Sequence, residues 1–221
     1  MGLWHVYYAD WQMECCGTPF ALGDEVSWPL LLSDADDVLG GGWHDQLTEI
    51  AGPVRDLPGD LGAVRVVADG TGLTVALHGH PVDVLAEEEL GGVRPGDRYR
   101  STGLLTVETH GDPELPETRG WVRAIQILGQ QFAETPPGSG TREPVPAQRS
   151  LRSARACPKW FPDAAAGVIV ALDVPDTDSR LSSAIREARG IPADRAGSET
   201  TGLPPADLAA LLETLSTTAM P

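Results

Sequence analysis

Short strand patterns separated by turn residues recur along the first 128 residues, and this recurrence limits the folds open to the chain. Each pattern is rich in β-branched or aromatic residues and is bounded by glycine, proline or aspartate. The patterns lie at 3–11, 25–30, 63–68, 73–77, 98–109 and 121–128. One helical pattern interrupts them, at 43–51, where Trp43, Leu47 and Ile50 share a face. The sequence therefore predicts a mainly β fold, a small OB-like or SH3-like barrel with one short inserted helix.

The composition changes after residue 128, and we expect the chain to divide there. Residues 129–160 are rich in proline and arginine and poor in apolar residues, which is typical of a linker or a long loop. Residues 161–221 begin a new pattern, with an apolar strand at 167–172 and two amphipathic helices, the first capped by Asp178. The predicted parts are a barrel core at 1–128, a Pro-rich linker, and a C-terminal strand with two helices, α+β overall.

The stretch from Leu3 to Leu32 is the densest in aromatic side chains, with six of the twelve in the chain. Such side chains dominate core packing, so we expect the core to begin here. Within this stretch, WQMECCGTPFALGDEVSW at residues 11–28 resembles the N-terminal signature of an uncharacterised family, a domain of unknown function, from high-GC Gram-positive bacteria. The resemblance continues more weakly to about residue 128. It implies a shared fold and no chemistry, so no functional residue is carried over from it.

The charge of the chain is strongly negative and uneven. There are 32 acidic and 16 basic residues, for a net charge of −16, and Arg55 is the one base among the first sixty residues. This field repels nucleic acid and anionic membranes and favours a basic protein partner. Three cysteines do not form a disulfide framework, and neither a signal peptide nor an apolar run of about 18 residues is present. These features predict a cytoplasmic protein.

A candidate metal site combines Cys15, Cys16, His78 and His80. Histidines two residues apart on a strand point to the same side, and thiolate with imidazole is a ligand set that zinc prefers. Adjacent cysteines on regular backbone point apart, however, which favours the alternative that both pack beside a turn. Under that alternative His78 and His80 lie in a solvated loop, and no cofactor is expected.

Aromatic residues and arginines supply a second set of candidates, for an interaction surface. Arg98 and Arg100 share one face of a predicted strand, and Trp121 and Arg123 share a face of another. Mixtures of this kind bind single-stranded nucleic acid in OB-like barrels. Ion pairs with the acidic residues nearby explain the arginines equally well. The candidate interaction residues are Trp11, Trp28, Arg98, Arg100, Trp121 and Arg123.

Signatures of catalytic nucleophiles, zinc proteases and phosphate-binding loops are absent from the sequence. His44 precedes Asp45, and His110 lies two residues before Asp112, but closeness in sequence is weak support for acid–base chemistry. The leading interpretation is therefore a non-enzymatic protein-interaction or regulatory module with a protein partner. The alternatives are a zinc or small-ligand binding protein and a single-stranded nucleic-acid binding protein. The sequence leaves the oligomeric state open.

Overall fold

The structure is a computed structural model that describes residues 2–40, 47–58, 63–68, 72–77, 93–110, 115–162, 165–190 and 205–218. Strands predominate among these residues. The strands are β1 (Gly2–Ala9), β2 (Glu25–Ser33), β3 (Thr48–Leu57), β4 (Val64–Ala68), β5 (Thr74–Ala76), β6 (Arg98–Val107), β7 (Glu117–Glu134), β8 (Arg142–Ala154) and β9 (Ala165–Val174). The helices are α1 (Asp10–Cys15), α2 (Ala35–Leu39), α3 (Arg180–Ala188) and α4 (Pro205–Thr218).

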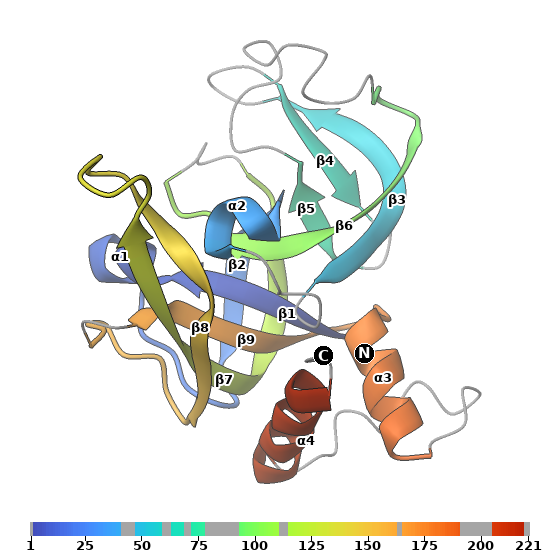
Figure 1. The fold of residues 1–221 in the computed structure, drawn as a ribbon. Coiled ribbons are helices and arrows are strands. Elements are labelled where there is room, and N and C mark those ends of the chain that lie inside the picture. The colour runs from blue at the N-terminus through green and yellow to red at the C-terminus, as the bar shows by residue number, and fades with distance from the viewer. Residues whose placement is uncertain are drawn as a thin grey trace.

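Eight strands form a closed barrel (Figure 1). Their order is β2-β5-β4-β3-β6-β1-β9-β7, and antiparallel pairing of β2 with β7 closes the ring. The second half of β2 also pairs with β6, from Leu30 opposite Val107 to Ser33 opposite Leu104. The prediction of a mainly β barrel is confirmed, and its OB-like or SH3-like type stays a prediction.

The apolar run predicted as a strand at 167–172 is β9, and it lies inside the barrel sheet between β1 and β7. Every residue of β1 is buried, and so is every residue of β9 except Ala165. Strands buried on both faces are continuously apolar rather than alternating, as this run is. The C-terminal part of the chain therefore contributes a central strand to the barrel.

Helices α3 and α4 pack on the outside of this central sheet, and α3 also contacts β3 (Figure 1). Leu208 and Leu212 of α4, together with Ile185 of α3, pack on a strand surface that includes Leu3. The two predicted amphipathic helices are confirmed, although Ser179 rather than Asp178 caps α3, accepting a hydrogen bond from the Ser182 amide (3.1 Å). None of the helices in the described part of the chain has the length and apolar character needed to span a bilayer.

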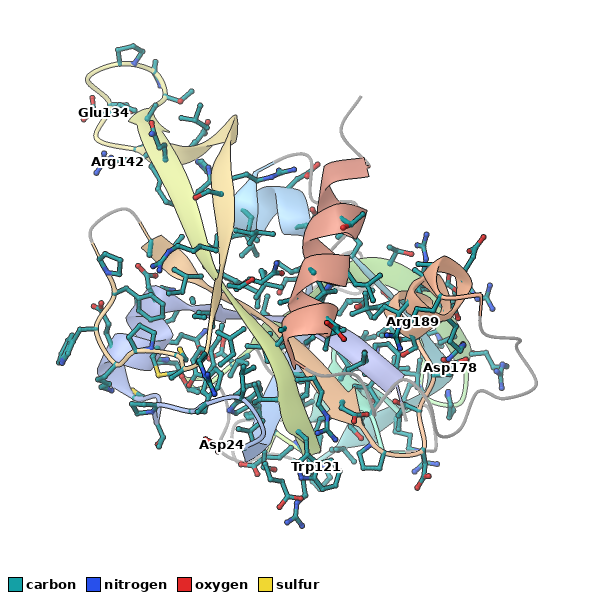
Figure 2. The ribbon with its side chains drawn as sticks, turned by 90° about the horizontal axis from the view of Figure 1, so that it is seen from below. Asp24, Trp121, Glu134, Arg142, Asp178 and Arg189 are labelled. Carbon is teal, nitrogen blue, oxygen red and sulfur yellow. The ribbon has the colours of Figure 1, made fainter. Side chains whose placement is uncertain are left out.

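The linker expected at 129–160 is instead largely a β-hairpin. β7 continues to Glu134, and β8 returns antiparallel to it, with Glu134 opposite Arg142 near the tip (Figure 2). Pro144 and Pro146 fit because, in the described sheet, β8 is the outermost strand, where a missing amide hydrogen breaks no ladder hydrogen bond on the open side. A composition that is unusual for a central strand is therefore compatible with this edge strand.

The helix predicted at 43–51 is wrong from Thr48 onward, because β3 begins there; residues 41–46 lie outside the described residues. Thr48, Ile50, Gly52 and Val54 are buried in alternation, which is the period of a strand. The inserted helices are elsewhere, as α1 directly after β1 and as α2 after β2.

A buried ion pair joins β7 to β9 and supports a stability prediction. The Arg123 guanidinium lies 3.0 Å from Oδ2 of Asp173, whose side chain is only 1% exposed. The second oxygen, Oδ1, has no hydrogen-bond partner among the described residues. We expect Arg123→Met to lower the free energy of unfolding by about 3 kcal/mol, because it leaves a buried carboxylate unpaired.

Urea denaturation would measure this loss, and the double variant Arg123→Met/Asp173→Leu is the control. It removes both charges, so we expect it to regain most of the stability. A single variant as stable as the wild type would contradict the assignment of Asp173 as a carboxylate that depends on Arg123.

Candidate metal centre

Helix α1 presents two adjacent cysteines at its C-terminal end. Asp10 stands in its first turn, where a negative charge interacts favourably with the helix dipole. The helix ends at Cys15, and the amides of Cys16 and Gly17 both donate to the Gln12 carbonyl at 2.9 Å. Both cysteine side chains are exposed. The turn thus leaves two thiols side by side at the surface.

His110 follows β6 and is held against α1 by a short hydrogen-bond network. The Thr109 amide and hydroxyl both donate to Oε1 of Gln12 at 2.9 Å, and Gln12 itself is buried. The His110 amide donates to Oε1 of Glu108 at 2.6 Å. A buried glutamine on the helix therefore fixes the backbone that carries the imidazole.

The imidazole of His110 lies between the two thiols. Its Nε2 is 3.3 Å from Sγ of Cys15 and 3.3 Å from Sγ of Cys16. The three donor atoms lie within 4.8 Å of one another, and among the described residues this is the group whose His, Cys, Asp or Glu atoms could hold a metal ion. The Trp11 ring stacks at a tilt on the imidazole, with centroids 4.8 Å apart. The site is exposed and brings two thiols and one imidazole together.

The charge state of the thiols follows from their surroundings. The pKa of Cys16 lies above its usual value because of a hydrogen bond with Cys15, with desolvation and the negative charge of Cys15 adding to the effect. The Lys159 ammonium opposes this rise. Burial raises the pKa of Cys157 to about 12, so this third cysteine stays a thiol. Metal binding at Cys16 is therefore expected to release a proton.

The structure describes one half of the metal site predicted from the sequence. Cys15 and Cys16 lie together, whereas His78 and His80 lie outside the described residues. The imidazole near the thiols belongs to His110. Because β1 and β6 run parallel, with Tyr7 opposite Thr106, the segments that follow these two strands emerge at the same end of the sheet. His110 is 94 and 95 residues from Cys16 and Cys15 in the chain, so no local sequence signal marks their contact.

The predicted interaction residues do not form one surface, and several of them are buried or form ion pairs within the protein. Trp11 is 53% exposed, but Trp28 is 8% exposed and packs in the core. Arg98 and Arg100 lie on β6 beside β3, whereas Trp121 and Arg123 lie on β7 beside β2 and β9. Two of the candidate arginines form ion pairs, Arg100 with Glu49 and Arg123 with Asp173, and Arg119 nearby on β7 pairs with Glu25. These pairs favour a structural role for the arginines.

Residues 2–174 match the model of a protein family described as a family of unknown function (DUF6578). The chain belongs to the DUF6578 family. The match runs from β1 to the end of β9, so the DUF6578 region contains the whole barrel, the β7–β8 hairpin and all three donors of the candidate metal centre. It also extends well past residue 128, to which the sequence resemblance reached. No match was found among curated proteins or among solved structures.

Proposed function

We propose that the protein binds a thiophilic divalent metal ion of the zinc class through Cys15, Cys16 and His110. The observation that carries this proposal is the position of His110 Nε2, 3.3 Å from each of the two sulfur atoms. Cysteine and histidine together are the ligands that zinc prefers, and they disfavour calcium and magnesium, which take oxygen ligands.

The size of the donor triangle supports a single shared ion. With zinc–sulfur and zinc–nitrogen bonds of about 2.3 and 2.05 Å, a tetrahedral site separates sulfur from nitrogen by about 3.5 Å. The two sulfur–nitrogen distances of 3.3 Å are close to that separation. An ion could therefore bind with small side-chain movements and without a change in the fold.

Three protein donors leave one tetrahedral position for water or for a donor from another molecule. All three donors are exposed, so that position can be reached from solvent. This arrangement fits a metal-binding or metal-responsive module, and we propose no turnover for it.

Cobalt substitution tests the ligand set. We expect the wild-type chain to bind one Co²⁺ with the visible bands of a tetrahedral site and a sulfur-to-cobalt charge-transfer band in the near ultraviolet. Cys16→Ser removes one thiolate and should lower the charge-transfer intensity by about half, because each Cys thiolate is a separate metal ligand. Cys157→Ser is the matched control, since the Cys157 thiol is buried and donates to the Pro158 carbonyl (3.7 Å).

Equal loss of the charge-transfer band in Cys16→Ser and Cys157→Ser would argue against the site, as would a wild-type chain that shows no such band with Co²⁺.

We also propose, as a second function, that a protein partner binds beside this centre. Trp11 and Trp160 are 53% and 69% exposed, which is unusual for such large apolar side chains. The segment that carries Trp160 lies against α1, because the Phe161 amide donates to Oε1 of Glu14 (3.1 Å). A partner retained equally by the wild type and by Trp11→Ala/Trp160→Ala would rule out this surface.

A further inference from the structure

A cavity of about 610 Å³ lies next to the candidate metal centre. It is bounded by the Cys16–Phe20 turn and by β2. Glu108 and Thr109, which follow β6, and Leu115 and Glu117, near the start of β7, complete its lining. Asp24, directly before β2, is among its lining residues and is labelled in Figure 2. Small-molecule sites are typically about 300 to 1,000 Å³, so the cavity is large enough for a small organic ligand.

The ionised side chains that line this cavity are all carboxylates, among the residues that the structure describes there: Asp24, Glu25, Glu108 and Glu117. Three of these already have partners. Glu25 pairs with Arg119 (2.7 Å), while Asp24 and Glu108 accept backbone amide hydrogen bonds. Glu117 has no hydrogen-bond or ion-pair partner among the described residues, so its charge is available to a ligand.

One wall of the cavity is aromatic and contains a polar atom with no partner. Tyr8, Phe20 and Trp28 pack together, with ring centroids 5.0 to 6.2 Å apart. Tyr8 is only 2% exposed, yet its hydroxyl has no hydrogen-bond partner among the described residues. A Cβ at Gly17, another lining residue, would lie 2.7 Å from this hydroxyl. Gly17 thus packs closely against the Tyr8 residue, and both residues line the cavity.

A hydroxyl that lines a cavity and has no partner among the described residues can bond to a ligand or to water there. An ammonium group supplies hydrogen-bond donors and a positive charge together, which suits both a hydroxyl oxygen and a carboxylate. Aromatic faces attract cations and also bury an apolar body. The Lys159 ammonium donates to the Met13 and Gly17 carbonyls (2.7 and 3.0 Å) and does not line the cavity.

We propose that this cavity binds a small primary amine, in its ammonium form, that carries an apolar or aromatic body. The ammonium donates to the Tyr8 hydroxyl and to Glu117, and the body packs on Phe20 and Trp28. The amine would bind without a metal ion, and Cys15 and His110 do not line the cavity, so this site is distinct from the metal centre, although Cys16 borders both.

Calorimetric titration of the full chain with phenethylamine, and with 2-phenylethanol as its neutral counterpart, tests this proposal. We expect the amine to bind at least about tenfold more tightly than the alcohol, because a charge-assisted hydrogen bond contributes more than a neutral one. Glu117→Gln and Tyr8→Phe should each weaken amine binding by about fivefold or more. Glu143→Gln, which alters an exposed carboxylate on β8, should leave amine binding unchanged.

The stability of Tyr8→Phe against urea shows whether a loss of amine binding comes from the missing hydroxyl or from a damaged fold. The hydroxyl it removes makes no described hydrogen bond, so the variant should unfold at the same urea concentration as the wild type. Amine affinity equal to alcohol affinity, or amine affinity unchanged by both variants, would overturn the proposal.

The titration is run on chelator-treated and on zinc-saturated protein. We expect the amine to bind in both. Binding that occurs only with zinc would mean that the amine contacts the metal, which overturns the cavity proposal and leaves the metal proposal intact. If the chain binds the amine but binds no zinc, the metal proposal is overturned and the cavity proposal stands.

Discussion

Replacing His110 with alanine is expected to weaken zinc binding by more than about 100-fold, since loss of a group that only orients a ligand already costs about 10- to 100-fold. The imidazole lies 3.3 Å from both sulfur atoms and is one of the three donors. His110 is exposed, so its removal should leave the fold unchanged. Competition between the protein and a chromophoric zinc chelator would give the affinity of each variant.

The zinc affinities of Gln12→Ala and Glu143→Gln serve as comparisons for that of His110→Ala. Gln12 holds the Thr109 amide and hydroxyl and does not reach the metal, so its loss should weaken zinc binding by about tenfold. Glu143 lies on the edge strand β8 and is not one of the donors, so its substitution should have no effect. A His110→Ala chain with an affinity within about threefold of the wild type would remove His110 from the ligand set.

Gly167→Ala is expected to lower the free energy of unfolding by about 3 kcal/mol or more. Gly167 has φ +136°, and a Cβ there would lie 2.3 Å from the Tyr8 carbonyl oxygen and 3.0 Å from Cα of Ala9. These atoms are backbone of β1, which pairs with β9 along its whole length. Neither strand can move away without breaking the barrel's central ladder.

Gly23→Ala is the matched control for Gly167→Ala. Gly23 also has a positive φ, +91°, but nothing lies within 4 Å of its Cβ position. Its substitution therefore carries the backbone strain alone, about 1 kcal/mol. Urea denaturation followed by tryptophan fluorescence compares the two, and equal losses would show that β1 and β9 are not packed as closely as described.

The sequence predicted those elements whose patterns are local and strong. The apolar run of β9 and the leucine spacing of α4 both identify elements that are present, because burial on both strand faces or on one helix face leaves a regular pattern. The expected strand at 121–128 is likewise part of β7, although β7 is longer at both ends.

The errors have identifiable physical causes. The helical spacing of Trp43, Leu47 and Ile50 coincided with the alternating burial of Thr48, Ile50 and Val54 in β3, and over so few residues the two periods are hard to separate. Residues 129–160 looked like a linker because β8 is an edge strand, where prolines are allowed and an apolar face is not required.

The candidate site was half predictable for a similar reason. Cys15 and Cys16 are conspicuous as neighbours, whereas His110 joins them only through the parallel pairing of β1 with β6. The network of Gln12 and Thr109 that holds His110 depends on the same pairing. Contacts between segments this far apart are set by topology, which residue spacing does not encode.

Native mass spectrometry of the zinc-titrated chain tests the proposed metal centre most directly. We expect the wild type to carry one zinc ion that is lost on acidification, because the two thiolates are then protonated. At limiting zinc the bound fraction should rise with pH, since Cys16 has a raised pKa and must lose its proton to bind. The variant Cys15→Ser/Cys16→Ser should carry none. A wild type without zinc, or a double-serine variant that retains wild-type zinc binding, would contradict the account.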